Sequence, residues 1–443
     1  MKKLKLFNLA WPIFVETSLF MLLGFVDVFV LSRYDDLAAS SVNTANQAVS
    51  IVTIVFTVIS GASAVLISQY LGAGKRENAS RIAALSIALN FVIGIIISLI
   101  LLIFSKPILI FIGAKGDLLE FSGQYLSIVG GSIFFQSVLG AMAVIIRNHG
   151  MTRISMYVTV GMNIINTGLD IVLVLGLFGL PKMGVLGVAI ATTFSRFVGM
   201  IILGIVLFKK VEKITIFKLL KPFPKSDLAD IFKIGIPSAL ETFLYNLSQL
   251  VITSLVLNFL TETELITKTY VQNITMFFYL FAMSIAQASQ IIIGHLVGAN
   301  ETDEAYRQGL KSYFCALGIT SAVCVVGVVF RTQLISIFSS DAEVIALGAN
   351  ILLLNVILEF GRTTNLVLIA CLRGSGDVFF PTACAIFSNW LISVFGSYIL
   401  AVVLGMGIYG LWIALAADEC VRGILMILRW KSGKWKAKRI VKN

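Results

Sequence analysis

The sequence predicts an all-α polytopic membrane protein with twelve transmembrane helices. Of its 443 residues, 58% are hydrophobic and 13% are charged, whereas soluble domains carry about 25% charged residues. Apolar stretches of about 20 residues, enough for a helix to cross a hydrocarbon core of about 30 Å, recur along the whole chain. A membrane barrel would show alternating strands of about ten residues instead. We therefore expect helices, because a helix satisfies its own backbone polar groups in lipid.

Twelve candidate spans follow one another along the chain. The first is too long and too close to the second to be a cleaved signal peptide, so we interpret it as a membrane helix. The five cysteines fall in spans of the second half without metal-binding spacing, so the sequence predicts no disulfide and no cysteine metal site. The spans are residues 8–32, 47–71, 81–105, 122–146, 154–178, 184–208, 229–257, 268–297, 308–330, 342–371, 378–404 and 408–429.

The distribution of positive charge predicts the orientation in the membrane. The net charge is +11, and most Lys and Arg residues lie at the N-terminus, in the even-numbered loops and in the C-terminal tail. This positive-inside pattern places both termini in the cytoplasm, and we expect the protein in the bacterial cell (inner) membrane. The longest basic segments, residues 209–225 and 430–439, are interpreted as orientation signals that can contact anionic lipid. No nucleic-acid partner is expected.

The two halves of the chain repeat each other at an offset of about 225 residues. The segment "WPIFVE" at 11–16 matches "IPSALE" at 236–241, with Pro and Glu in the same places. The segment "LGAGKRENASR" at 71–81 matches "VGANETDEAYR" at 297–307. Because this offset carries the first span onto the seventh with the same orientation, the halves are expected to be two parallel six-helix repeats. Repeats of this kind form a V around a central cavity, the geometry that alternating access requires.

The repeats divide the chain into two lobes. We expect an N-terminal six-helix lobe over residues 1–208 and a C-terminal six-helix lobe over residues 229–429. Residues 209–228 are interpreted as a basic cytoplasmic linker, and residues 430–443 as a basic cytoplasmic tail. A duplicated scaffold that transports nothing is the alternative.

Six segments together resemble the multidrug and toxic compound extrusion (MATE) transporters over essentially the full chain. They are "GFVDVFVLSRYDDLAASSV" at 24–42, "GASAVLISQYLGAGKRE" at 61–77, "NTGLD" at 166–170, "GVLGVAIAT" at 184–192, "GIPSALE" at 235–241 and "LRGSGD" at 372–377. The resemblance implies a V-shaped antiporter without a cofactor, which expels organic cations or amphiphiles in exchange for H⁺ or Na⁺. Asp27 resembles an acid that several MATE branches carry near the end of helix one. Asn166, Asp170 and Thr192 resemble the cation-site pattern of the DinF-like branch.

Asp27 and Asp170 are the candidates for carrying the coupling ion, because charged groups within membrane spans are costly and mark ion pathways. They lie at similar depths, about 9 Å and about 12 Å below the outer ends of their helices. Asn163 and Asn166 share the helical face of Asp170, and Thr192 reaches a comparable level. The oxygens of Asp27, Asn166, Asp170 and Thr192 can ligate Na⁺, or one carboxyl can carry a proton. A polar cluster that only fixes helix packing is the alternative.

Glu16 and Glu241 occupy equivalent repeat positions, each four residues after a proline. They are expected either to attract cationic substrate at the inner mouth or to cap the bend at the proline. NorM-like MATE members carry an acid one turn after the position of Glu241, where this chain has Tyr245. Further polar residues predict a water-filled lumen and complete the expected substrate pathway: Asn46, Gln47, Gln136, Gln272, Asn273 and Gln287.

Other charges in the second half are expected to be structural. Glu359 can pair with Arg362, and Asp418 with Arg422, because residues three or four apart meet on one helix face. The NorM-like pattern has an acid eleven residues before Arg373, where this chain has Arg362. This difference argues against a NorM-type cation site.

Secondary active export by alternating access is the predicted function. The alternatives are a lipid-linked oligosaccharide flippase of the same superfamily and a non-transporting membrane scaffold or channel. An enzyme is not expected, because the sequence contains no Walker motif, Ser-His-Asp set or metal cluster. We expect a monomer that handles small organic cations or amphiphiles and contacts membrane lipids.

Overall fold

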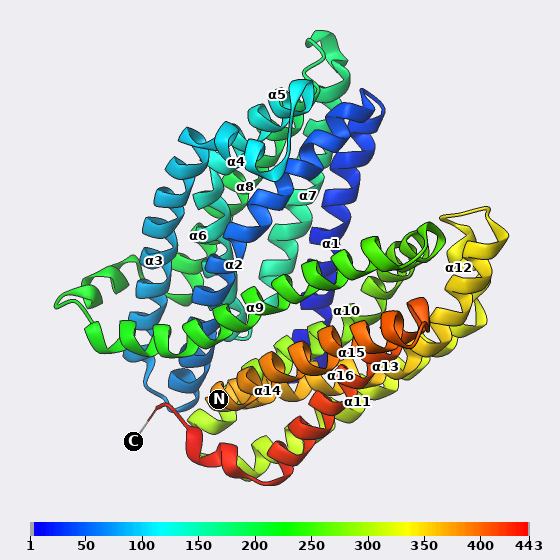
Figure 1. The fold of residues 1–443 in the computed structure, drawn as a ribbon. Helices are drawn as coiled ribbons and strands as arrows, with labels where there is room; N and C mark the ends of the chain where they lie inside the picture. Colours follow the sequence, from blue (N-terminus) through cyan, green and yellow to red (C-terminus); the bar gives the residue numbers. More distant parts are fainter. Residues whose placement is uncertain (1–3, 442–443) are drawn as a thin grey trace. The chain divides into compact units, whose positions relative to one another are not determined.

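Residues 4–441, which the computed structural model describes, form helices joined by short turns and contain no β-strand (Figure 1). The predicted all-α class is thereby confirmed. The α-helices are α1 (Leu6–Ser32), α2 (Asp36–Gly72), α3 (Arg76–Ile103), α4 (Ser105–Ile112), α5 (Gly116–Tyr125), α6 (Ile133–Asn148), α7 (Thr152–Leu175), α8 (Val185–Val206), α9 (Lys225–Phe259), α10 (Glu262–Gly298), α11 (Thr302–Val329), α12 (Arg331–Ser336), α13 (Ala342–Ser375), α14 (Phe379–Ser388), α15 (Phe395–Ser397) and α16 (Gly407–Lys431). Short 3₁₀ or π-helical segments continue or join them: η1 (Leu126–Gly130), η2 (Leu177–Gly179), η3 (Leu207–Val211), η4 (Ile214–Leu220), η5 (Asn389–Val394), η6 (Tyr398–Val403) and η7 (Lys434–Lys438).

Ten helices of the described chain are long and apolar enough to cross a membrane. An eleventh span results if the pair Gly116–Gly130 and Ile133–Asn148, bent by 45°, is counted as one. These eleven correspond to the first eleven predicted spans. The twelfth, α16, is a helix of 25 residues, but Asp418, Glu419 and Arg422 lie near its middle and lower its apolar character.

Several helices extend well beyond the predicted spans. Helices α2 and α10 each contain 37 residues, because hydropathy marks only the part of a helix that lies in hydrocarbon, whereas backbone hydrogen bonding continues into polar sequence. A capping box starts α10: the Thr261 hydroxyl accepts from the backbone N–H of Glu264, and the Glu264 carboxylate accepts from the Thr261 N–H at 2.9 Å.

The chain forms two compact units. One comprises Trp11–Leu71 and Lys75–Gly235, and the other comprises the described chain from Ile236 onward, the start of α1 and Gly72–Gly74. The boundary falls within α9, and the predicted division into lobes and linker stays a prediction.

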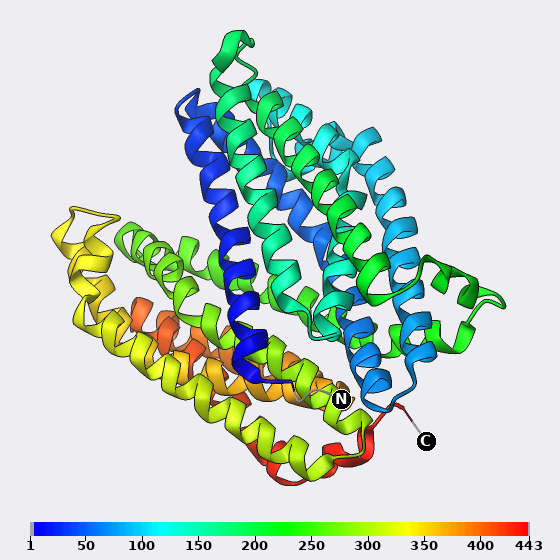
Figure 2. The ribbon, with the colours of Figure 1, turned by 180° about the vertical axis from the view of Figure 1, so that it is seen from behind.

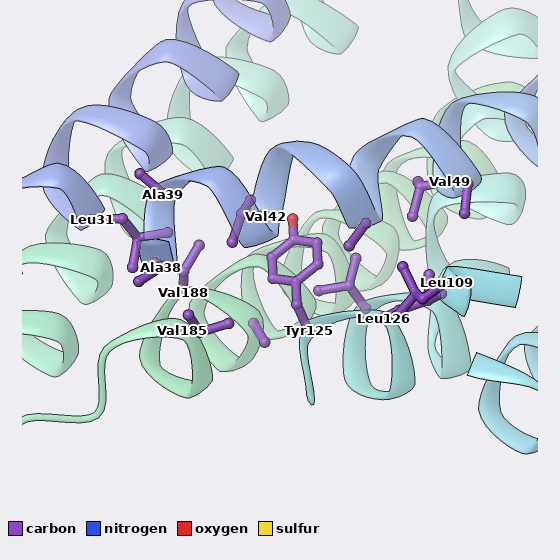
Figure 3. Packing of buried hydrophobic residues seen from close by; sticks show 14 of the residues in the cluster. Leu31, Ala38, Ala39, Val42, Val49, Leu109, Tyr125, Leu126, Val185 and Val188 are labelled. Carbon is purple, nitrogen blue, oxygen red and sulfur yellow. The ribbon is translucent and has the colours of Figure 1, made fainter. Parts of the chain in front are cut away.

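Each unit has its own buried apolar cluster. In the unit that contains α2 to α8, Tyr125 and Leu126 pack among apolar side chains of α1, α2 and α8 (Figure 3). In the other unit, Ile274, Ile351 and Trp412 bring α10, α13 and α16 together. Because lipid is as apolar as these side chains, close backbone approach contributes strongly to helix association in a membrane.

Gly361 marks such a close approach between α13 and α16. A Cβ atom added at Gly361 would lie 2.8 Å from the backbone nitrogen of Cys420 and 2.9 Å from the carbonyl carbon of Glu419. Any larger residue must therefore push the two helices apart.

The segment after α8 is fastened to its unit by a polar cluster. Glu212 accepts a hydrogen bond from the Ser80 hydroxyl at 2.7 Å, and its other carboxylate oxygen lies 3.6 Å from Nε2 of His149. Arg81 pairs with Asp227 at the start of α9. Burial lowers the pKa of His149 below its usual value, and Arg76 acts in the same direction.

Gly361→Ala is expected to destabilise the protein by about 1–3 kcal/mol, because the added methyl group overpacks the contact between α13 and α16. Gly318→Ala in α11 is the matched control, since no atom lies within 4 Å of its added Cβ. Both variants gain the same helix propensity, about 1 kcal/mol. Thermal denaturation of the purified variants in one detergent measures the difference, and equal midpoints would contradict the packing argument.

Acidification is expected to loosen the His149 cluster. Because the pKa of His149 is lowered in the folded chain, the unfolded chain binds more protons below about pH 6.5, and stability falls as the pH drops. The thermal midpoint should therefore decline less between pH 7.5 and pH 5.5 in His149→Gln than in the parent. The same pH dependence in both proteins would show that His149 contributes nothing.

Candidate cation-coupling site

Asp27 and Asp170 meet inside the unit that contains α1 and α7. These two helices lie side by side (Figures 1 and 2), and their carboxyl groups are within hydrogen-bonding reach of each other. Asp27 is 5% exposed and Asp170 is fully buried. A carboxylate only accepts hydrogen bonds, so two carboxyls in contact require a proton or a cation between them.

Asn166 bridges the two acids. With its NH₂ group turned toward them, Nδ2 lies 3.2 Å from Asp27 Oδ1 and 3.0 Å from Asp170 Oδ2, and Oδ1 accepts from the backbone N–H of Thr192 at 3.3 Å. This orientation gives both the oxygen and the nitrogen of the amide a partner, which is the criterion that assigns an amide. Asn166 precedes Asp170 by one helical turn, so both side chains project from the same face of α7.

Two residues that the sequence analysis did not assign to the site surround the pair. Arg196 on α8 is within electrostatic range of Asp27, and it follows Thr192 by one turn, a spacing that would have identified it. The Tyr125 hydroxyl donates to Asn46 Oδ1 at 3.4 Å, and its ring belongs to the apolar cluster of Figure 3. No sequence signal marks Tyr125, because only the folded chain brings it near the acids.

Several buried polar atoms around the acid pair lack a hydrogen-bond partner within residues 4–441. They are Oδ1 of Asp170, Nη1 of Arg196 and both amide atoms of Asn163. Asn163 is 8% exposed and is not hydrogen-bonded to the pair. Buried polar groups are normally satisfied, so these atoms are candidate partners for an ion or water.

Glu16 and Glu241 each form an ion pair with an arginine of the same half. Glu16 Oε1 lies 3.0 Å from Arg147 Nη1 and accepts from the Ser155 hydroxyl at 3.0 Å. Glu241 Oε2 lies 2.6 Å from Arg373 Nη2 and accepts from Thr382 at 2.7 Å. The predicted repeat thus places an acid, an arginine and a hydroxyl together in both halves.

A small cavity adjoins each of these ion pairs. One, of about 140 Å³, is lined by Glu16 and Phe20, and the other, of about 160 Å³, by Glu241 and Tyr245. Phe20 and Tyr245 are equivalent at the predicted offset of 225. The two cavities therefore belong to the duplicated scaffold.

The remaining residues of the expected substrate pathway differ in exposure. Gln47, Gln272 and Asn273 are exposed, whereas Gln136 and Gln287 are half-buried. They stay predictions for a pathway.

The predicted pairs of the second half are present and join into one network. Glu359 Oε1 lies 2.8 Å from Arg362 Nη1, and Asp418 Oδ2 lies 2.8 Å from Arg422 Nη2. Glu419 links them, at 3.8 Å from Arg362 and 3.0 Å from Arg422. Ile252, the repeat equivalent of Asp27, is fully buried in the apolar cluster of its unit, so the acid pair has no counterpart in this half.

Comparison with known families finds one that covers most of both halves. A family model described as MatE matches residues 12–172 and 237–399. Positions 12 and 237, where the two matches begin, are 225 residues apart, which is the offset of the predicted repeat.

Known proteins resemble this chain along its full length. The uncharacterized transporter YisQ of Bacillus subtilis is 38% identical over 434 residues, which cover 98% of this chain and 95% of the relative. A probable multidrug resistance protein NorM of Thermotoga maritima is 28% identical over 438 residues, covering 99% and 94%. A crystal structure of MATE in the bent conformation superposes with a TM-score of 0.89 at 20% identity, covering 99% of this chain and 98% of that chain. This last likeness shows a shared fold.

Glu16→Gln is expected to lower the free energy of unfolding by about 2–4 kcal/mol, because it leaves the half-buried guanidinium of Arg147 without its carboxylate. Glu241→Gln should cost about 1–2 kcal/mol, since the side chains of Glu241 and Arg373 are 19% and 27% exposed, against 5% and 18% for Glu16 and Arg147. Thermal denaturation measures both losses.

A double variant provides the control for this ion pair. Adding Arg147→Met to Glu16→Gln should recover part of the loss, because the unpaired charge is then gone. A raised KM for a cationic substrate at an unchanged thermal midpoint would instead indicate that Glu16 recruits substrate.

Proposed function

The chain belongs to the MatE family of membrane transporters, and on this premise we propose that it is a secondary active antiporter that exports organic cations or amphiphilic drugs in exchange for H⁺ or Na⁺. The contact between the buried acids Asp27 and Asp170 carries the proposal. The printed names of relatives, among them probable multidrug resistance proteins, support a drug-like substrate. Transporters of this family need no cofactor and are not enzymes.

The charge of the site favours one monovalent cation. With both acids ionised, Asp27, Asp170 and Arg196 leave one uncompensated negative charge, which is costly in the low dielectric of the membrane interior. One H⁺ or one Na⁺ neutralises it. Direct contact between two carboxyls favours the proton, because such a contact is a hydrogen bond only when one of them is protonated.

Oxygen ligands support the sodium alternative. Asp27, Asp170 and Thr192 supply carboxylate and hydroxyl oxygens, which are the donors that hard cations prefer. Asn166 would add its amide oxygen after its amide group turns, because its NH₂ group faces the acids in the assigned orientation. The similarity of "NTGLD" at 166–170 to the DinF-like pattern belongs to this proposal. Either ion would bind to the same pair of acids.

Coupling follows if the cation binds one conformation more tightly than the other. A ligand shifts a conformational equilibrium only by its difference in affinity between the states. A cation that enters from outside therefore biases the transporter away from the state that releases substrate, and its loss to the cytoplasm resets the cycle. If the bound cation lowers the affinity for substrate by some factor, reciprocity of linkage requires that bound substrate lower the affinity for the cation by the same factor.

The charge distribution supports an orientation with both termini in the cytoplasm, in the bacterial inner membrane. The basic segments at 209–225 and 430–439 lie on that side in this topology. The protein functions as a monomer in this proposal, since all residues of the acid pair come from one chain.

Asp27→Asn and Asp170→Asn are each expected to reduce gradient-driven ethidium transport at least tenfold at an unchanged thermal midpoint, because neither variant leaves a carboxyl pair to bind the cation. Asp117→Asn, which replaces an exposed acid at the start of α5, should transport normally. Proteoliposomes with a pH or a sodium gradient imposed separately measure the activity and identify the coupling ion. Normal gradient-driven transport by Asp27→Asn would refute the assigned role.

A further inference from the structure

A groove of about 500 Å³ runs along α14 and α16 and ends at the C-terminal turn. One wall is apolar: Phe379, Phe387 and Leu391 line it and are 77%, 75% and 68% exposed. These residues belong to the candidate span Phe379–Val403, so their exposed faces meet lipid. From Phe379 to Leu391 the helix rises by about 18 Å, which exceeds half of a hydrocarbon core of about 30 Å.

The other end of the groove is polar and basic. Asp377, Arg429 and Lys438 line it. Arg429 donates through Nε to Asp377 Oδ2 at 2.7 Å and covers the Phe380 ring at 4.6 Å from its centroid. Lys438 is exposed and forms no ion pair with any described residue. One acid and two bases leave a single positive charge at this end.

Lys438 is held in place by the fold of the tail. Trp435 stacks on Trp430 at 4.2 Å between ring centroids, and its indole N–H donates to the Trp430 carbonyl at 2.9 Å. The Lys438 carbonyl lies 2.5 Å from where a Cβ of Gly376 would stand. Gly376 also has φ of +97°. A glycine therefore suits this position, because it has no Cβ to clash with the carbonyl and adopts a positive φ without strain. The packed C-terminal turn therefore holds Lys438 at the groove.

The groove has the polarity of a phospholipid in a membrane leaflet. Its polar end lies where α13 ends and α16 makes its last turns, at the level of the membrane surface, and its apolar wall extends toward the bilayer centre. A cationic substrate is repelled by the net positive charge. A soluble protein does not reach an apolar wall on a membrane span.

We propose that this groove binds an anionic phospholipid, with one acyl chain against Phe379, Phe387 and Leu391 and the phosphate at Lys438 and Arg429. Lys438 supplies the free charge, and Arg429 supplies guanidinium N–H groups beyond the one that Asp377 accepts. A zwitterionic phospholipid fits the apolar wall equally well but gains less at the basic end. The bound lipid joins α14, α16 and the C-terminal turn, and this role is independent of the coupling ion and the exported substrate.

Native mass spectrometry of the detergent-solubilised full chain, titrated with palmitoyl-oleoyl phosphatidylglycerol or phosphatidylcholine, tests the headgroup. Lys438→Gln should weaken binding of the phosphatidylglycerol about fivefold, since one Lys near the surface contributes about 1 kcal/mol, and should leave phosphatidylcholine binding unchanged. Lys434→Gln, an exposed residue of the same tail that does not line the groove, is the matched control and should bind both lipids normally.

A second pair of variants tests the groove itself. Ala383 lines it, and Ala383→Trp should abolish retention of both lipids by filling the space for the acyl chain. Val325→Trp, on an exposed face of α11, should retain them. Equal phosphatidylglycerol affinity in the parent, Lys438→Gln and Ala383→Trp would overturn the proposal. Dimer dissociation by Ala383→Trp without loss of lipid would also overturn it, because a second copy of the chain would then be the occupant.

Discussion

Two carboxylates buried together in a membrane protein are the constraint on which the rest of this structure depends. Asp27 and Asp170 lie within reach of each other, with Arg196 as the cation nearby. The desolvation of an ion in a medium of low dielectric costs several kcal/mol even after relaxation, so such a pair cannot stay fully ionised without a bound cation. Asn166 offsets part of this cost by donating to both acids. A scaffold that only needed a helix contact would gain more from apolar side chains.

Comparison of the two repeats distinguishes the contacts that both halves share from the acid pair that only one half has. Both halves keep an acid and an arginine in equivalent places, Glu16 with Arg147 and Glu241 with Arg373, and a hydroxyl donates to each acid, from Ser155 and Thr382. Because both repeats keep this acid–arginine pair, it belongs to the duplicated scaffold. The acid pair, by contrast, exists in one half. In the other half, the buried acids Glu359 and Asp418 pair with Arg362 and Arg422 and not with each other.

The sequence predicted the helical class, eleven of the spans and the offset of the repeat, because hydropathy and internal similarity are local properties. It also predicted that Asp27 and Asp170 lie at one depth, since helical rise converts residue number into height. It did not identify Tyr125, because contact between helices depends on how each is rotated. The partners of Glu16 were missed for the same reason, with Arg147 more than 130 residues away. The sequence predicted that Glu16 and Glu241 either attract substrate or cap the bends at their prolines. Both roles stay predictions, and the structure adds an arginine partner for each acid.

Helix α1 is the element best placed to respond to the charge of the acid pair. In its most apolar stretch, 22% of residues are buried, against 61% in α10, so it has few packing contacts to hold it. Polar contacts fix it at two levels, through Glu16 to Arg147 and through Asp27 to Asn166. The first contact does not change when a cation binds between the acids. The second does, because a proton or sodium ion removes the repulsion between α1 and α7. In the proposed antiporter, a helix anchored at one end and repelled at the other would convert the binding of a small ion into a displacement of its outer half.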